Sequence, residues 1–579
     1  MTGTTTTDPR ARAAGWALGG LLCLYAVVLL RTAWLSDDAY ITFRTIDNWI
    51  HGYGLRWNVA ERVQTCTHPL WMFLHAGLYA LSGEIYYTSI LLCIGVSLAA
   101  VILFAARLAA GALPALVGVT VFTLSKAFTD YSTSGLENPL THLLLVLFLY
   151  VYLREPAAGA ATAQRPQQAG PRGGLSAGAL PGWRTLLALA LLAALLALNR
   201  PDALLPVLPA LCARFWRARS WRAVGTVLLG LVPLIAWELF ALLYYGSPLP
   251  NTAYAKLNNG IPAGELLGQG LWYLWASLRW DPLTPAAIVA GLAVGLSRRQ
   301  ARHVSLAVGV LLYMAYLLFI GGDFMLGRFL TAPLVVAVAL LARVPLSRRT
   351  GLLLFLLAGI IGAAPPRSPL SAGRDYGDVV GVLIDGHGIC DERGYYYHAT
   401  GLLLAPGRDP WPDHSYVRQG RAARQRGEPV VVARCVGMFG YCAGPAVHIV
   451  DELALADPLL ARLKPIPGRR WRPGHYHRQI PEGYVETLRS GQNVIADPAL
   501  AAYYEKLRLV TRGRVWDGKR LLEVAKLNLG MYGHLLSGAV GPANEPQPPV
   551  GQRGARPVRA VHEGKHPAAR PRPAPVASR

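Results

Sequence analysis

Residues 14–38 read AGWALGGLLCLYAVVLLRTAWLSDD, an apolar run that ends in two adjacent carboxylates, Asp37 and Asp38. As a helix, the run is long enough to cross a hydrocarbon core about 30 Å thick. No small-residue cleavage site follows it, so we expect a retained span rather than a removed signal peptide. Acids at the end of a membrane helix are costly unless they have a structural or chemical role. The stretch therefore predicts a membrane protein with a polar site at one membrane face.

Apolar runs of this kind recur through the first two thirds of the chain. Of the 579 residues, 53% are hydrophobic and 15% are charged, whereas about 25% are charged in a typical soluble domain. We expect a mainly α, polytopic membrane fold with about eleven transmembrane helices, in the runs 14–34, 86–106, 113–129, 136–153, 184–199, 203–215, 223–245, 283–297, 304–320, 329–342 and 350–364.

The loops between these runs are of two kinds. Short arginine-bearing loops alternate with loops that carry motifs such as SDDAYITFR and GGDFMLGRF. With eleven spans, every arginine-bearing loop lies on one side, which the positive-inside rule assigns to the cytoplasm together with the N-terminus. This count requires 68–83 and 263–280 to lie at the outer interface as short helices rather than to cross. Ten to thirteen spans remain compatible with the pattern.

Composition divides the chain into four parts. We expect a transmembrane catalytic domain, a flexible Ala/Gly/Pro/Gln-rich cytoplasmic linker within it, a mixed α/β domain on the outer face, and a disordered Pro/Arg-rich tail. Their predicted bounds are 1–364 for the transmembrane domain, 155–183 for the linker, 365–540 for the outer domain and 541–579 for the tail.

The outer domain shows strand-like segments, EPVVVARCVGMFG and AVHIVDEL, followed by helical patterns at 497–508 and 517–530. Cys435 and Cys442 flank VGMFGY, which we interpret as a hairpin. A disulfide there would need an oxidising compartment, and the pairing of these two thiols and Cys390 stays open.

The formal net charge of +23 raises the question of nucleic-acid binding. Most of the arginines, however, lie in short loops between apolar runs and in the tail. Membrane topology and anionic lipid explain such a distribution. We therefore expect membrane lipids, and no nucleic acid, among the partners of the chain.

Conspicuous polar residues of both signs gather in the loops assigned to the outer face. A cavity that holds carboxylates beside cations suits chemistry on a phosphorylated substrate, because arginine and lysine bind phosphate and a carboxylate takes a proton from an attacking hydroxyl. The acids are Asp37, Asp38, Glu137, Asp202 and Asp323, and the cations are Arg44, Arg62, Arg200, Lys256 and Arg328.

Several of these residues also have an ordinary structural interpretation, whereas Lys256 has no strong structural role in its loop. The two acids after the first run would end that helix at the membrane interface and cap the segment after them. Glu137 would lie at the start of a helix, where a negative charge suits the helix dipole. Asp202 follows Pro201 and is placed to cap the next helix. Asp323 and Arg328 would form a salt bridge across a tight turn, although the two glycines before Asp323 indicate close backbone approach.

Six segments together resemble one enzyme family. The likeness covers about residues 34–485 and is most specific in the first segment and in GGDFMLGRFL. The segments are DDAYITFRTIDNWIHGYGLRWNVAERVQTCTHPLW (37–71), TSGLENPL (133–140), NRPDA (199–203), GGDFMLGRFLTAP (321–333), GYCAGPAVHIVDELALADPLLARL (440–463) and RPGHYHRQIPEGY (472–484). They resemble the GT-C class of glycosyltransferases that use polyprenyl-phosphate sugars, most of all the terminal arabinofuranosyltransferases. His68, in CTHPLW, departs from the Ser or Thr expected before this proline.

The resemblance implies a GT-C fold and an enzyme of the bacterial inner membrane, with the C-terminal domain outside. Such an enzyme transfers a pentose, D-arabinofuranose, from a polyprenyl-phosphate donor to a periplasmic glycan, lipid or protein. It implies Asp37 as the catalytic residue, with Asp38 beside it. The donor phosphate would contact Arg328, Lys256 and Arg62, and the sugar or acceptor would contact Asp202, Asp323, Arg44, His68, Asn251 and Glu137.

Two alternatives remain at this point. Within the class, the enzyme would transfer mannose or aminoarabinose to lipid or protein. From a different class, a transporter or flippase would show inverted repeats and charges at the bilayer midplane, which we do not find in the sequence. No cofactor is indicated, and a divalent metal stays open because His475 and His477 have no further ligands at ordinary spacing.

Overall fold

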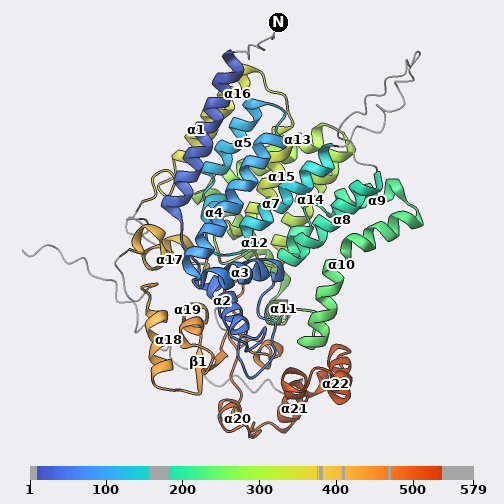
Figure 1. The fold of residues 1–579 in the computed structure, drawn as a ribbon, viewed down its shortest axis with the longest axis vertical. Helices are drawn as coiled ribbons and strands as arrows, with labels where there is room; N and C mark the ends of the chain where they lie inside the picture. Colours follow the sequence, from blue (N-terminus) through green and yellow to red (C-terminus); the bar gives the residue numbers. More distant parts are fainter. Residues whose placement is uncertain are drawn as a thin grey trace, which may run out of the picture. The chain divides into compact units, whose positions relative to one another are not determined.

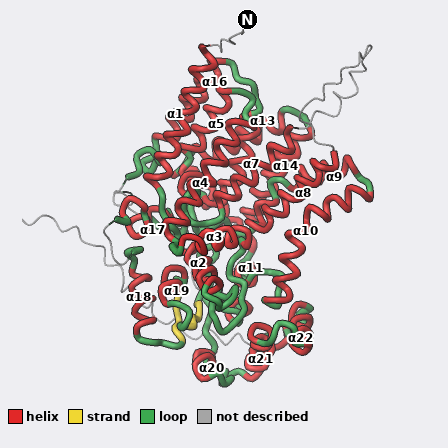
Figure 2. Tube along the Cα trace, viewed as in Figure 1, coloured by secondary structure: helices red, strands yellow, loops and turns green. Residues whose placement is uncertain are grey.

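Helices make up most of the chain, as the sequence predicts (Figure 2). The computed structural model describes residues 9–536 apart from 155–181, 258, 374–375, 377–382, 407–410 and 467–470. Nearly all of the predicted linker and the whole predicted tail lie outside the described residues.

Within these described ranges, the apolar part of the chain contains the helices α1 to α16 (Figure 1). Their bounds are α1 Pro9–Thr32, α2 Asp37–Ile50, α3 Pro69–Ser82, α4 Tyr86–Leu103, α5 Ala112–Leu124, α6 Lys126–Asp130, α7 Asn138–Arg154, α8 Gly182–Asn199, α9 Leu208–Ala218, α10 Trp221–Tyr244, α11 Asn251–Leu257, α12 Ala263–Trp280, α13 Leu283–Ser297, α14 Ala301–Phe319, α15 Thr331–Ala342 and α16 Arg348–Ala363. A π-turn, η1 Phe104–Leu108, extends α4, and short 3₁₀ turns lie at η2 Pro201–Leu204 and η3 Arg328–Leu330.

Among the described residues, five helices are long and apolar enough to cross a membrane: α1, α4 with η1, α8, α10 and α14. Helices α12 and α13 together would make a sixth span, but they meet at a bend of 109°. Helices α5, α7 and α15 are apolar but shorter. The chain is therefore a multi-pass membrane protein, while the predicted count of eleven spans stays a prediction.

The centre of the helical part is built on close contacts between small residues. Almost every side chain of α15 is buried, and α15 packs against α7, α13 and α5. Gly291 of α13 lies so close to α15 that a β-carbon on it would be 2.5 Å from the β-carbon of Ala337. Gly230 of α10 meets Ala190 of α8 in the same way. Small residues at such crossings allow membrane helices to approach and gain dispersion contacts.

The segment after α16, here called the C-terminal segment, is also mainly helical. Its elements are α17 Glu392–Thr400, η4 Leu402–Leu404, α18 Ser415–Gln425, β1 Val430–Ala433, α19 Gly437–Ala443, β2 His448–Asp451, η5 Leu460–Arg462, α20 Tyr484–Ser490, α21 Pro498–Arg512, α22 Gly518–Asn528 and η6 Gly533–Leu535. Helices α21 and α22 confirm the two helical patterns predicted there, and β1 and β2 lie in the two predicted strand-like segments.

One local prediction in this segment is wrong. Strands β1 and β2 are parallel, with Val430 opposite His448, so the chain between them crosses over instead of turning back as a hairpin. The stretch VGMFGY, for which the sequence predicts a hairpin, lies in helix α19 from Gly437 onward. The seven cysteines all lie in described residues, and all are free.

Candidate active site

The DDAYITFR motif begins helix α2. The Ser36 hydroxyl caps the helix by accepting the Asp38 backbone N–H at 3.3 Å, so both acids lie in the first turn, where a negative charge suits the helix dipole. Ten of the fourteen α2 residues are buried, and the helix packs against both α3 and α19. The motif is therefore held between the helical part and the C-terminal segment.

Asp37 is fully engaged with the C-terminal segment. Its carboxylate oxygens accept the backbone N–H groups of Met438 at 2.8 Å and Gly437 at 3.3 Å, at the start of α19. Val436, at the N-cap position of α19, offers no side-chain acceptor, so Asp37 supplies the cap from 400 residues away. Burial raises the pKa of Asp37 to about 7, against the effect of the two N–H donors.

Asp38 has a different environment. It is half-buried, and within the described part of the chain its carboxylate makes no hydrogen bond or ion pair. Burial and then the charge of Asp38 raise the pKa of Glu392 to about 8. Asp38 also interacts electrostatically with Asp323 and Arg328. Of the two acids in the motif, Asp38 is thus the one whose carboxylate is available to a substrate.

Glu137 is the centre of a cluster of alternating charges, the central cluster. It accepts from Arg328 at 2.9 Å and from Arg200 at 3.2 Å, and it lies 3.5 Å from the Nδ1 atom of His68. His68 is in turn bonded through Nε2 to the Thr42 hydroxyl of α2, at 2.8 Å. These charges come from the ends of separate apolar helices: Glu137 precedes α7, Arg200 follows α8 and Arg328 precedes α15.

Two further acids complete the central cluster. Asp202 accepts the Arg200 Nε at 2.9 Å and the Tyr313 hydroxyl at 2.9 Å, so its oxygens are used within the protein. Asp323 lies 4.0 Å from Arg328, and its Oδ2 atom is buried and accepts no hydrogen bond from the described residues. Burial raises the pKa of Asp323.

Lys256 approaches this region from α11. Its side chain is exposed, and in the described part of the chain it forms no ion pair. The Nζ atom is 3.2 Å from the position that a β-carbon would take at Gly474. The positive charge of Lys256 partly opposes the rise that burial causes in the pKa of Asp323. Lys256 is therefore a cation near Asp323 that a ligand could reach.

Arg44 binds backbone carbonyls instead of lining the cluster. It donates to Trp57 at 2.8 Å, to Val447 at 2.8 Å and to Gly440. Its guanidinium also lies over the Trp57 ring, 4.6 Å from the centroid. The geometry favours a structural role for Arg44, joining α2 to the C-terminal segment, over the predicted contact with sugar or acceptor.

Arg62 and Asn251 are engaged in the same manner. Arg62 donates to the carbonyls of Tyr244, at 3.0 Å, and Gly513. Asn251 donates to three carbonyls of the loop 454–457, at 3.0 to 3.1 Å. These contacts favour structural roles over the predicted binding of phosphate by Arg62 and of sugar by Asn251.

Glu392 lies near Asp38, and sequence reasoning does not single it out. It begins α17 directly after Asp391, which caps that helix by accepting the Gly394 backbone N–H at 3.1 Å. The run of three charges in CDERGYYYH is the one available signal for this acid in the sequence.

Arg472 is a second charged residue that the sequence does not single out as a site residue. It lies over the Phe324 ring, 5.0 Å from its centroid. Its positive charge partly opposes the rise in the pKa of Glu392 that burial and Asp38 cause. It precedes the HYH motif, in which only the two histidines attract attention as ligands.

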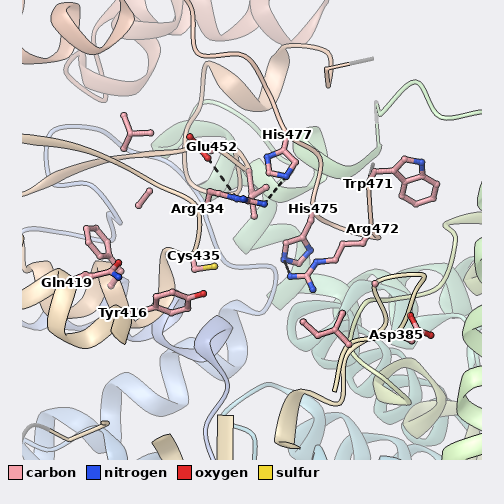
Figure 3. A pocket seen from close by; sticks show the side chains of 16 residues that line it. Asp385, Tyr416, Gln419, Arg434, Cys435, Glu452, Trp471, Arg472, His475 and His477 are labelled. Atoms are coloured by element: carbon pink, nitrogen blue, oxygen red, sulfur yellow. Dashed lines mark hydrogen bonds and ion pairs between the residues drawn. The ribbon is translucent and has the colours of Figure 1, made fainter. Parts of the chain in front are cut away.

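A cavity of about 800 Å³, the outer cavity, opens beside this region (Figure 3). Cys435 and Phe439, which flank the start of α19, belong to one wall. On another wall, the His475 ring lies 4.4 Å from the Phe324 ring, next to Asp323. The lining residues are Ile384, Asp385, Gly388, Tyr416, Gln419, Val432, Ala433, Arg434, Cys435, Phe439, Glu452, Leu453, Trp471, Arg472, His475 and His477.

A second hollow, the apolar groove, is formed by residues of α2 and α3 together with residues of α8 and α10. It has a volume of about 410 Å³. Leu198 is two residues before Arg200, so part of the groove lies close to the central cluster. Its lining is Trp49, Leu55, Pro69, Leu70, Phe73, Leu198, Pro233, Ala236, Trp237 and Phe240.

The described residues contain no group of three or more His, Cys, Asp or Glu side chains arranged to hold a metal ion. The charged groups near Asp38 are carboxylates paired with arginines, together with the unbonded oxygen of Asp323. The arrangement is suited to binding an anion next to an accepting carboxylate, as transfer from a phosphate ester requires.

Comparison with known proteins gives the class of this protein: the chain is a membrane glycosyltransferase. It is similar to the terminal beta-(1->2)-arabinofuranosyltransferase of Mycobacterium tuberculosis, at 27% identity in an alignment 541 residues long that covers 78% of this chain and 82% of that protein. It is also similar to the Corynebacterium glutamicum protein of the same name, at 30% identity over 331 residues, 52% of this chain and 46% of that protein. The resemblance stated from the sequence is thereby confirmed.

A solved structure, ArnT from Cupriavidus metallidurans bound to undecaprenyl phosphate, matches with a TM-score of 0.42 at 16% identity, over 78% of this chain and 77% of that chain. No protein-family model matches the chain.

Proposed function

We propose that the chain transfers D-arabinofuranose from a polyprenyl-phosphate donor to a hydroxyl of a cell-envelope acceptor on the outer side of the inner membrane. The observation that carries the proposal is the Asp38 carboxylate, which is unbonded among the described residues and acts electrostatically on both Arg328 and Glu392. The names of the two relatives support the choice of sugar.

The transfer step follows from the chemistry of a sugar phosphate. The acceptor oxygen bonds to the anomeric carbon, and the bond from that carbon to the phosphate oxygen breaks. The electron pair leaves with the polyprenyl phosphate, and the acceptor proton passes to Asp38. A positioned general base of this kind accelerates such a step by about 10²–10⁴-fold.

Two cations are assigned to the donor phosphate. Lys256 is exposed and forms no ion pair among the described residues. Arg328 is the more accessible of the two arginines on Glu137, with 15% of its side chain exposed against 7% for Arg200. Both charges are suited to a phosphate oxygen.

The acids and the histidine of the central cluster take roles according to their contacts. Asp323, with one unbonded oxygen, is assigned to a sugar hydroxyl. Glu137, His68 and Asp202 are positioning residues, since their polar atoms hold the two arginines or each other in place.

The donor lipid requires a site of its own. An isoprenoid chain is apolar, and the apolar groove is lined by helices α8 and α10, both long enough to cross a membrane. Leu198 of its lining is two residues before Arg200, so a tail in the groove would bring its phosphate toward the central cluster. This arrangement keeps the tail in an apolar environment and the phosphate beside cations.

The test is transfer in membranes from radiolabelled polyprenyl-phosphoryl arabinose by Asp38→Asn, Asp37→Asn and the exposed control Glu486→Gln. We expect Asp38→Asn to lose at least about 10²-fold in rate while still binding the donor, and Asp37→Asn to keep a much larger share. Wild-type rates in Asp38→Asn would remove this residue as the base. Faster use of a mannosyl or aminoarabinosyl donor by the wild type would show that the proposed sugar is wrong.

A further inference from the structure

The outer cavity has no part in the transfer step described above. Its volume of about 800 Å³ lies in the range of roughly 300–1,000 Å³ that is typical of sites for organic ligands. All of its lining residues belong to the C-terminal segment: three come from 384–388 and the others from residues after 415. We therefore expect a cavity of this size near the proposed base to bind a ligand.

The lining disfavours a lipid tail and favours a sugar chain. In the view of Figure 3, Tyr416 and Gln419 lie at one end of the cavity and Trp471 and Asp385 at the other. Aromatic rings provide apolar faces for the C–H side of a sugar ring, while charged and amide groups bond its hydroxyls. An isoprenoid chain would leave these polar groups without partners, at a cost for each.

Two arginine–histidine pairs lie between the ends of the cavity. Arg472 donates to His475 Nε2 at 2.9 Å, and Arg434 donates to His477 Nε2 at 3.0 Å (Figure 3). Both imidazoles accept through Nε2 and are therefore neutral, and burial and Arg472 hold the pKa of His475 well below its usual value. A guanidinium has five N–H donors, so each arginine keeps donors for a ligand oxygen.

The charges of the cavity balance. Two guanidinium groups, Arg434 and Arg472, stand against two carboxylates, Glu452 and Asp385. Glu452 lies 4.0 Å from Arg434, and Asp385 is held by two backbone N–H groups of its own loop. With both histidines neutral, the lining has no net charge, which suits a neutral ligand better than an anion.

The cavity is also connected to the reacting groups. Its wall at His475 packs on Phe324, the residue after Asp323. At the Cys435 wall, burial and then the charge of Asp37, the neighbour of Asp38 in the chain, raise the pKa of the Cys435 thiol.

A third link runs through Arg472. This residue lines the cavity and interacts electrostatically with Glu392, on which Asp38 acts in turn. The lining of the cavity is therefore coupled electrostatically, through Glu392, to Asp38.

We propose that the outer cavity binds the acceptor: a neutral oligosaccharide of several sugar residues, whose terminal hydroxyl reaches Asp38. The proposal rests on the proposed function for the direction of transfer, but binding itself does not require the donor. Trp471 and Tyr416 are the stacking faces, and the two arginine–histidine pairs, with Glu452, bond the hydroxyls.

The test uses a synthetic arabinofuranosyl pentasaccharide and the full-length protein in detergent. The variants are Trp471→Ala and Arg434→Gln, with Trp516→Ala and Arg421→Gln as matched exposed controls outside the cavity. We expect each cavity variant to raise the Kd of the pentasaccharide, measured calorimetrically without donor, and its KM by at least about tenfold. The KM of the donor should stay constant, and the controls should match the wild type.

Three results would overturn the proposal. One is unchanged Kd and KM in both cavity variants at unchanged thermal midpoints. Another is absence of pentasaccharide binding by the wild type. The third is competition by inorganic phosphate that Arg434→Gln abolishes, which would assign the cavity to an anion. Binding that depends on Trp471 without transfer from the arabinose donor would retain the acceptor site and reject the proposed donor.

Discussion

Asp37 and Asp38 are neighbours of the same chemical type, yet their surroundings give them different tasks. Asp37 is buried against two backbone N–H groups of α19, whereas the Asp38 carboxylate is unbonded among the described residues and acts on Glu392 and Asp323. The resemblance implies Asp37 as the catalytic residue and Asp38 as its neighbour. The contacts favour the reverse assignment, because a base must have a free oxygen to accept the proton.

The role of Asp37 as a cap predicts a loss of stability. Asp37→Ala leaves the two N–H groups of Gly437 and Met438 without this acceptor, and losing a cap costs about 0.5–2 kcal/mol. Asp37→Asn keeps one amide oxygen and should lose less. Thermal unfolding in detergent measures both. Equal midpoints for wild type and Asp37→Ala would contradict the capping role.

Glu392 predicts a pH dependence of donor binding. Its pKa is raised to about 8, so the side chain is neutral below that pH and becomes a carboxylate above it. The new negative charge lies near Asp38, which itself acts on Arg328 of the proposed phosphate site, so the KM for the donor should rise as the pH passes upward through about 8. In Glu392→Gln the rise should be absent. A parallel rise in both proteins would assign the effect to another group.

The sequence reveals these residue types but not their partners. Arg44, Arg62 and Asn251 stand in motif-like loops, which is why the sequence places them among the substrate contacts. Their side chains bind backbone carbonyls as far as 451 residues away, and a carbonyl has no signature in a single sequence. The residues of the central cluster, which do meet, are recognisable because most of them stand at the ends of apolar runs.

At the scale of elements, the hydrophobic periodicity of the sequence is not enough to predict α19 as a helix. GMFGYCA is only seven residues long, and its two glycines favour a turn. The helix forms because its first N–H groups find Asp37 and because it packs on α2 and α18. Helices α21 and α22, which carry their own caps at Asp497 and Asp517, are predictable from the local sequence.

The close approach of α19 to α2 at Gly437 predicts that a side chain at this position is not tolerated. A β-carbon there would lie 1.9 Å from the Asp37 carbonyl oxygen, a contact that no side-chain movement relieves. Gly437→Ala should therefore displace α19 from α2 and strongly reduce the yield of folded protein and its transfer activity. Gly518→Ala, at a helix start with open space around it, is the matched control. Normal folding and activity of Gly437→Ala would show that the backbone at this contact moves enough to accommodate the methyl group.

At the scale of the molecule, a buried ionic network joins the helical part to the C-terminal segment. Asp130 of α6 pairs with Lys126 and with Arg393 of α17, and Asp391 pairs with Lys126 and Arg367. The sequence predicts two domains there but gives no sign of this junction. Asp130 and Arg393 are 263 residues apart, and such a pair leaves no local pattern.

Asp130→Asn should destabilise the junction. It leaves Arg393, which is fully buried, without this carboxylate, and breaking a buried pair costs about 3–5 kcal/mol. The thermal midpoint in detergent should fall well below that of the exposed control Glu486→Gln. A midpoint equal to the control would mean that the network contributes nothing to holding the two parts together.

The long reach of Arg44 has a consequence for how the protein is made. This side chain lies in α2, near the start of the chain, yet it binds the carbonyls of Gly440 and Val447, 396 and 403 residues further along. A ribosome adds about 5–20 residues per second, so roughly 20–80 s pass between synthesis of the first loop and arrival of its partners. During that interval α2 carries its two acids but lacks the contacts that fix it to the C-terminal segment, so we expect an unfinished chain to transfer little of the sugar. A stop codon before residue 437 would leave every apolar helix in place and still abolish the enzyme.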